Sequence, residues 1–253
     1  MVNGLQRDYD ALIATDCSDV VALLIDGKGF GKKPNEVCLI AALGITEDGT
    51  KKLLGIWSGG TENSSVVKEL LDDLIKRGLK EPKLTVLDGS KALHKAITDK
   101  WSEAVIARCQ IHKQRNVLSH VSESQISWVG DQYNRIIHAS SYEEGAKQAQ
   151  ILIKQLAKVN VSAAHSLAEG LNELLVPLLI KDANLRRFFS STNAIESVFS
   201  MLQTKTGRVR RWRSANSVMF WVATAYRQQQ KNLHRVKGHK FMAELAELKS
   251  RLR

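Results

Sequence analysis

The segment Val20–Gly29, VVALLIDGKG, sets the interpretation of the whole chain. Its apolar run stops at one acid, Asp26, which a glycine follows at once. A related pattern, LTVLDGS, recurs at Leu84–Ser90 and puts Asp88 in the equivalent place. Short apolar runs bounded by turn residues predict buried strands, and open α/β sheets carry functional side chains at the carboxyl ends of strands. One such Asp-Gly pair would indicate only a turn, but two favour a shared site.

Turn and periodicity signals extend this pattern into a mixed sheet. Asp48-Gly49 is a hairpin-turn dipeptide, so the strands on either side of it should be antiparallel. Apolar residues at helical spacing after residue 63 predict an amphipathic helix that Gly78 closes. The expected strands cover Val20–Asp26, Glu36–Ile45, Lys51–Trp57, Leu84–Leu87 and Ala104–Ala107, and the expected helices cover Ser64–Arg77 and Lys91–Lys100.

The stretch from about 113 to 180 has a different character, because it shows no convincing strand. Ser122 with Gln125, and Ser141 with Glu144, have the spacing of capping boxes, which mark helix starts. We therefore expect three parts: residues 1–112 as the first part of an α/β core with strands 1–5, residues 113–185 as an α-helical insertion, and residues 186–253 as a last helix and a basic region that complete the core.

Composition indicates an ordinary globular protein. The 253 residues are 43% hydrophobic and 25% charged, which suits one large core, alone or with an inserted subdomain. The three cysteines, Cys17, Cys38 and Cys109, have no disulfide-framework spacing and favour a reducing compartment. The N-terminal residues lack the apolar segment of a signal peptide, and no apolar run is long enough to span a bilayer. We expect a soluble, cytoplasmic protein with no membrane partner.

Positive charge is concentrated late in the chain. Lys and Arg number 37 against 26 Asp and Glu, a net charge of +11, and the segment from Ser197 to Lys240 holds ten bases and no acid. A solvated helical face usually mixes both signs, so this segment favours a polyanionic partner, with nucleic acid ahead of a membrane surface. Trp212 within it either stacks on a base or anchors the segment to the core. The candidate DNA contacts are Lys205, Arg208, Arg210, Arg211 and Arg213.

Two further signals are ambiguous when taken alone. Glu196 opens a predicted helix, but Asn193 stands three residues before it, so the pair fits a capping box as well as a third acid of the site. The motif RCQIH ends the fifth expected strand and contains Cys109 and His112. This pair is either half of a zinc site that lacks its partner pair or a buried cysteine with a hydrogen-bonded histidine beside it.

Taken in order, these motifs resemble the hallmarks of mutator-type transposases of bacterial insertion sequences. The matching segments are LLIDGKG, LTVLDGSK, RCQIHKQRN, STNAIESVFS and the basic KTGRVRRWR, which together extend over most of the chain. The resemblance implies an RNase H-like α/β fold, with a mixed five-stranded sheet flanked by helices and an all-helical insertion before the final catalytic helix. It also implies a DDE triad of Asp26, Asp88 and Glu196, with Cys109 and His112 supporting the site.

The same resemblance implies a chemistry and a set of partners. The three acids would hold two Mg²⁺ ions, for which Mn²⁺ can substitute, and water would cut the element ends. The freed 3′-hydroxyl would then attack target DNA. The expected partners are transposon ends, target DNA and further copies of the chain, as a homodimer or a larger synaptic complex near the bacterial nucleoid. The alternatives are another RNase H-like nuclease, such as a junction resolvase, and a DNA-binding remnant without activity.

The sequence departs from the family pattern in two respects. Full-length members carry an N-terminal region that binds the transposon ends, whereas this chain starts almost at the first strand. We therefore expect a truncated copy, a remnant or an isolated catalytic core. Members of the wider group also often place Lys or Arg two helical turns beyond the glutamate. This chain has Gln203 there, and Lys205 is the nearest base.

Overall fold

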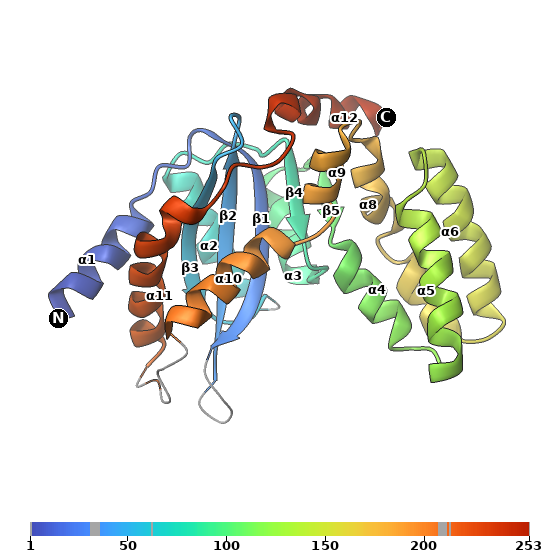
Figure 1. The fold of residues 1–253 in the computed structure, drawn as a ribbon, viewed down its shortest axis with the longest axis horizontal. Helices are drawn as coiled ribbons and strands as arrows, with labels where there is room; N and C mark the ends of the chain where they lie inside the picture. The colour runs from blue at the N-terminus through green and yellow to red at the C-terminus, as the bar shows by residue number, and fades with distance from the viewer. Residues whose placement is uncertain (1, 31–35, 62, 207–211, 213, 253) are drawn as a thin grey trace.

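The computed structural model of the chain describes residues 2–30, 36–61, 63–206, 212 and 214–252. Its centre is a five-stranded sheet with the order β3-β2-β1-β4-β5 (Figure 1). β1 and β3 are antiparallel to β2, whereas β4 runs parallel to β1 and β5 parallel to β4. The mixed five-stranded sheet flanked by helices is therefore confirmed. The strands are β1 (Val20–Phe30), β2 (Val37–Thr46), β3 (Lys51–Ser58), β4 (Leu84–Leu87) and β5 (Ile106–Arg108).

The end of β1 differs from the prediction in a way that matters for the site. β1 does not stop at Asp26 but continues to Phe30, because β2 remains hydrogen-bonded to it along the whole hairpin. Its other neighbour is shorter: the last parallel pair joins Ile25 to Leu87. Asp26 thus lies inside a strand but just beyond the end of the parallel pairing, and Asp88 follows Leu87 at the same edge.

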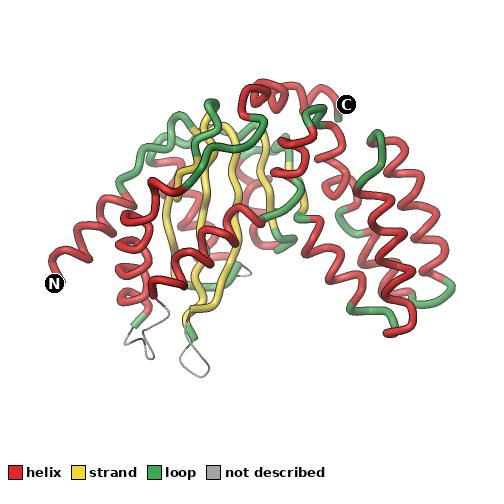
Figure 2. Tube along the Cα trace, in the orientation of Figure 1, coloured by secondary structure: helices red, strands yellow, loops and turns green. Residues whose placement is uncertain are grey.

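Helices cover both faces of the sheet (Figure 2). Successive side chains of a strand point to opposite faces, so Leu24 packs with the helices of one layer, whereas Leu23 and Ile25 pack with those of the other. The layer with Leu24 contains α10 (Asn193–Thr206) and α11 (Ala215–Gln229), and the opposite layer contains α2 (Ser64–Lys76) and α3 (Lys91–Lys100).

A first helix, α1 (Val2–Ile13), was not predicted. It packs against α11, where the rings of Tyr9 and Phe220 lie 5.2 Å apart and Asp8 forms an ion pair with Arg227. Leu12 is buried in the same cluster as the sheet. The segment is short and weakly apolar, so the contact with α11 rather than its own helical propensity accounts for its position.

The helical stretch between β5 and α10 has a core of its own. Val117, Tyr133, Leu152 and Leu167 are all buried in one cluster that excludes the sheet. The capping box of Ser122 and its partner is confirmed, and the Ser141 hydroxyl accepts the Glu144 N–H. The stretch contains α4 (Gln110–Leu118), α5 (Glu123–Ile137), α6 (Tyr142–Ala157), α7 (Val161–Ala168), α8 (Leu171–Leu175), η1 (Val176–Leu179) and α9 (Ala183–Phe189). The domain boundaries at 112 and 185 stay a prediction.

The last elements return to the far end of the sheet. η2 (Gln230–Asn232), η3 (His239–Glu247) and α12 (Leu248–Arg251) follow α11, and α12 contacts η1 of the helical stretch. In the part of the chain that the structure describes, no helix combines the length and apolar character needed to cross a bilayer.

Candidate active site

Asp26 is a buried carboxylate with few compensating contacts. Asp26 is only 4% exposed, and its side-chain Oδ1 accepts the Gly27 N–H at 2.8 Å. Burial raises the pKa of Asp26 to about 6, although a hydrogen bond from Thr192, the charge of His112 and the Gly27 N–H all act in the opposite direction. The buried, ionised carboxylate therefore destabilises the folded protein, and a positive charge nearby would reduce this destabilisation.

Glu196 comes from the first turns of α10. The carbonyl of Thr192 accepts the N–H groups of Ile195 at 2.9 Å and Glu196 at 3.0 Å, so Thr192 is the N-cap of this helix. The capping box between Asn193 and Glu196 is therefore not formed, since Glu196 lies one residue past the N3 position. Its Oε1 instead lies 3.5 Å from Nε2 of His112.

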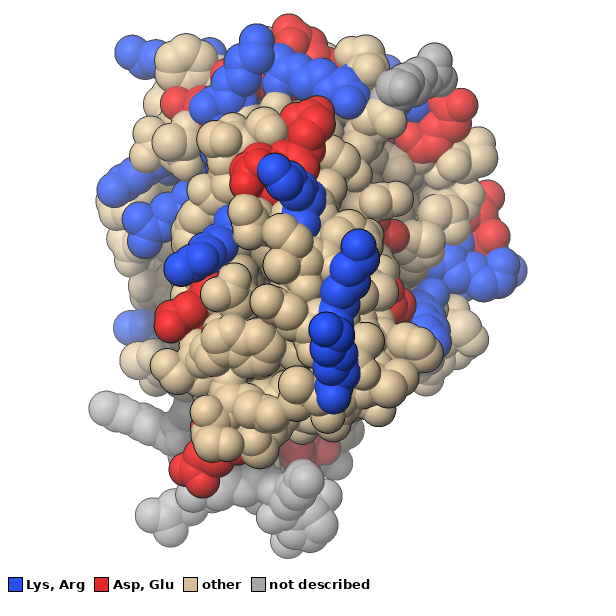
Figure 3. Space-filling model, turned by 90° about the vertical axis from the view of Figure 1, so that its right-hand side faces the viewer, with Lys and Arg blue, Asp and Glu red and all other residues tan. Residues whose placement is uncertain are grey.

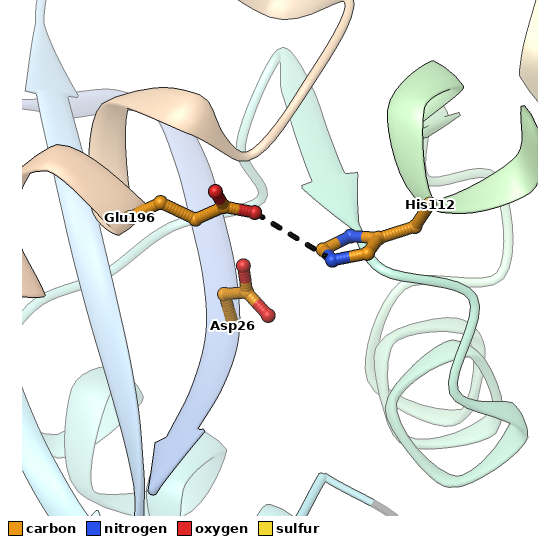
Figure 4. Close-up of side chains that lie close together, drawn as sticks. All are labelled: Asp26, His112 and Glu196. Atoms are coloured by element: carbon orange, nitrogen blue, oxygen red, sulfur yellow. Dashed lines mark ion pairs between the residues drawn. The ribbon is translucent and has the colours of Figure 1, made fainter. Parts of the chain in front are cut away.

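Three potential ligand side chains meet at this point. Asp26 from β1, His112 from α4 and Glu196 from α10 each offer an atom within 4.8 Å of the others. Figure 4 shows both carboxylates and the imidazole pointing toward one another from these three separate elements. These positions are up to 170 residues apart along the chain, so the fold rather than a local motif assembles the group.

Cys109 supports the ring of His112 rather than joining the group of three. Cys109 is fully buried, and its Sγ accepts the Thr192 N–H at 3.4 Å. The hydrogen bond with Cys109 is the largest cause that raises the pKa of His112 to about 9; burial opposes it, and the charges of Cys109, Asp26 and Glu196 assist it. Burial raises the pKa of the Cys109 thiol, but hydrogen bonds from His112 and Thr192 outweigh burial and lower it. His112 therefore carries positive charge toward the two carboxylates.

Asp88 lies at the same edge but outside the group of three. Its Oδ1 accepts the Ser90 N–H at 2.8 Å, and its Oδ2 accepts the Thr61 hydroxyl at 3.1 Å. Its charge contributes to the raised pKa of Asp26, and it lines one open pocket together with His112. The structure thus brings Asp26 and Glu196 together and leaves the Asp88 carboxylate beside them, bound to Ser90 in its own loop and to Thr61 in the loop between β3 and α2.

Thr192 is the site residue that the sequence analysis missed. It is fully buried, it caps α10, and its hydroxyl lies 3.5 Å from both Cys109 Sγ and His112 Nδ1. One signal was present, because threonine before a helical run is a favoured N-cap. Nothing in the sequence indicated that the same hydroxyl would also reach Asp26.

The basic segment is only partly described. Lys205 is exposed at the end of α10, whereas the other predicted DNA contacts, Arg208, Arg210, Arg211 and Arg213, lie outside the described residues. Trp212 is 8% exposed and packs in the core beside the sheet, so it acts as an anchor rather than a free stacking surface. Two other bases of the segment are paired within the fold: Arg227 with Asp8, and Arg235 with Asp48 at 2.9 Å.

Comparison with known proteins identifies the family. The chain is 28% identical over 190 residues to the transposase for insertion sequence element IST2 of Acidithiobacillus ferrooxidans, an alignment that covers 75% of this chain and 64% of that protein. It is 29% identical over 208 residues to the transposase for insertion sequence element IS6120 of Mycolicibacterium smegmatis, covering 79% and 63%. The chain thus spans less than two thirds of the length of these relatives. The family model described as "Transposase, Mutator family" matches residues 5–235, and the chain therefore belongs to the Mutator family of transposases.

Proposed function

We propose that this chain is a transposase catalytic core that cuts and joins DNA phosphodiesters with divalent cations held by Asp26, Asp88 and Glu196. The observation that carries the proposal is the meeting of Asp26, His112 and Glu196 within 4.8 Å. A buried carboxylate, a second carboxylate and a cationic donor in one place are of little use to the stability of the fold. They suit a site that handles a phosphate and a metal.

The donor set fits magnesium. Mg²⁺ prefers oxygen ligands and keeps several waters, so one or two carboxylates and a substrate phosphate complete its shell. Asp26, Asp88 and Glu196 would hold the ions, and Mn²⁺ would serve in place of Mg²⁺. The elevated pKa of Asp26 supports this assignment, because a cation would offset the cost of its buried charge. When bound, the ions would supply an activated water and stabilise the leaving oxygen.

The protein's own residues would hold and orient the reacting groups. The His112 imidazolium presents an N–H and a positive charge beside Glu196, where a non-bridging phosphate oxygen would accept a hydrogen bond. Thr192 would fix the Asp26 carboxylate, and Cys109 would fix the imidazole. Hydrolysis breaks one phosphorus–oxygen bond and leaves a 3′-hydroxyl. Attack of that hydroxyl on a target phosphodiester then forms a new bond and releases the target's own 3′-hydroxyl.

Partners follow from this chemistry. The substrates would be element ends and target DNA, with Lys205, Arg208, Arg210, Arg211 and Arg213 contacting phosphates. Two ends must be joined in one event, so a homodimer or larger complex of this chain would act on DNA in the bacterial cytoplasm.

The test uses supercoiled plasmid with Mg²⁺ or Mn²⁺, and an oligonucleotide with a 3′-hydroxyl copied from the DNA that flanks the coding sequence. The variants Asp26→Asn and Glu196→Gln should lose both nicking and joining. The matched control is Asp131→Asn, which removes one exposed acid from α5 and should keep both. Cutting of branched junctions without joining would indicate a resolvase instead. DNA retention without any cutting by the unaltered chain would indicate a binding remnant.

A further inference from the structure

Two open pockets adjoin along α4 and lead away from the metal-binding side chains. The first has a volume of about 380 Å³ and is lined by His112, Arg115, Asn116 and Ser119, with Asp88 at its inner end. The second has a volume of about 510 Å³ and lies between Asn116 and His120 on one side and α7 on the other. Asn116 lines both pockets, so the two lie side by side along one route over the surface. We call this path the α4 groove and define it by His112, Arg115, Asn116, Ser119, His120 and, on α7, His165.

The residues of the groove form one face of α4. Positions 112, 115 and 116 have the spacing of residues that share a helix face. Ser119 and His120 follow in the turn that closes α4, and all five residues are at least partly exposed. Lys113 and Val117 lie on the buried side of the helix. Figure 1 shows α4 between the sheet and α5, so a ligand on this face would extend from the catalytic edge toward the helical stretch.

The charge along the groove suits a polyanion. Asp88 lies at the inner end, where the proposed cations would offset its charge. Beyond it, residues 104–122 and all of α7 contain no aspartate or glutamate, and Arg115 adds a full positive charge. Glu169 lies at the far wall, but it forms ion pairs with Arg108 at 3.2 Å and Lys113 at 3.1 Å, so that cluster is positive as a whole. The outer face of the helical stretch is different, because acidic and basic side chains are interspersed there around a broad uncharged area (Figure 3).

We propose that the α4 groove binds the sugar–phosphate backbone of the DNA segment next to the scissile phosphate. The inference rests on the proposed function and extends it, because it assigns the path that the substrate follows away from the site. Arg115 would pair with a phosphate, and the Asn116 amide and Ser119 hydroxyl would donate hydrogen bonds to phosphate oxygens. Asn116 lies four residues from His112, about 6 Å along the helix axis. At roughly 3.4 Å per nucleotide, that is about two nucleotides from the site.

The test replaces a neutral amide side chain by the carboxylate of the same shape, once inside the groove and once outside it. Asn116→Asp places it in the shared wall, and Gln155→Glu places it on exposed α6, away from either pocket. Binding of a fluorescein-labelled duplex of mixed sequence is followed by anisotropy, with Ca²⁺ in place of Mg²⁺. Asn116→Asp should weaken binding about five- to tenfold and reduce the slope of log K against log salt by about 0.9, the value of one phosphate contact. Gln155→Glu should leave both quantities as in the unaltered chain.

A second pair of variants guards against misfolding. Arg115→Ala should reduce the same slope by about 0.9, whereas Lys154→Ala, which removes one exposed base from α6, should not. Equal effects of the groove and α6 variants would overturn the proposal, as would an unaltered chain that does not bind the duplex. Failure of the proposed function looks different: Asp26→Asn would then nick plasmid as well as the unaltered chain does, while the groove variants would still weaken binding.

Discussion

Replacing Asp26 by asparagine should stabilise the metal-free protein while it abolishes activity. The side chain is 4% exposed, and burial raises its pKa from an ordinary 3.8 to about 6. A tenfold change in proton affinity is worth about 1.4 kcal/mol, so the ionised form costs the native state about 3 kcal/mol. Asparagine has nearly the same shape, and its side-chain oxygen can still accept the Gly27 N–H. It carries no charge to bury.

The size of the effect depends on pH. Because the folded pKa is the higher one, the native state binds more protons than the unfolded state between about pH 4 and pH 6. The unaltered protein therefore loses stability as pH rises through this window, and above it the loss is constant. Asp26→Asn cannot titrate at this position. The two proteins should be about equally stable near pH 4, and the variant should be more stable near pH 7.5.

Urea or thermal unfolding in EDTA measures this difference. At roughly 2–4 °C per kcal/mol for a chain of this size, the variant should melt about 6–12 °C higher near pH 7.5. Mg²⁺ should remove most of this difference, because a ligand at a hundred times its dissociation constant stabilises the unaltered protein by about 2.7 kcal/mol. The variant should gain much less.

Two results would refute the reasoning. The first is a variant that is less stable than the unaltered protein near pH 7.5 in EDTA, since burial of the charge would then carry no cost. The second is a difference that does not change with pH, since it could not come from titration at Asp26. Asp131→Asn on α5 is the matched control, because that acid is exposed and its loss should change the melting temperature little at any pH.

Three further changes have defined outcomes. Tyr133→Phe removes the hydroxyl that donates to the first carbonyl of α4 at 2.7 Å in the core of the helical stretch, so urea unfolding should show a loss of about 1–2 kcal/mol. Glu169→Gln leaves the fully buried Lys113 ammonium without its carboxylate, and the same measurement should show a loss of about 2 kcal/mol, less than for a fully buried pair because Glu169 is half exposed. Arg210→Ala with Arg211→Ala should lower the salt slope of DNA binding by up to about 2, and an unchanged slope would exclude these residues from the interface.

Local signals in the sequence were sufficient for much of the sheet and its helices. β4 and α3 have the predicted bounds, because an apolar run is followed by an N-cap: the Ser90 hydroxyl accepts the Leu93 N–H at 3.2 Å. The hairpin at Asp48-Gly49 was equally local, since Gly49 has a positive φ of 79°. These elements carry their own start and stop signals, so a single sequence suffices to find them.

The details of the site depend on contacts that no local pattern encodes. β1 runs past Asp26 because β2 stays paired with it to Phe30. Thr192 rather than Asn193 caps α10, and this frees Glu196 to face His112. The meeting of Glu196 with His112 is decided by the fold, because the two residues are 84 positions apart in the sequence. The resemblance named Asp26, His112 and Glu196, which the structure brings together, but it did not give their geometry.

The helical stretch helps to build the candidate site, because its contacts on two sides determine where His112 lies. On the sheet side, the Cys109 N–H donates to the Leu87 carbonyl at 2.8 Å, and the Gln110 N–H donates to the Ser190 carbonyl at 2.9 Å. On the other side, the Gln110 side-chain amide donates to the Leu174 carbonyl at 3.1 Å, and the buried Lys113 ammonium donates to the Ser166 carbonyl in α7. α4 is thus fixed between two cores, and a change in either one would move the imidazole relative to Asp26 and Glu196. An insertion that merely decorated the sheet would leave the first turn of α4 free of such contacts.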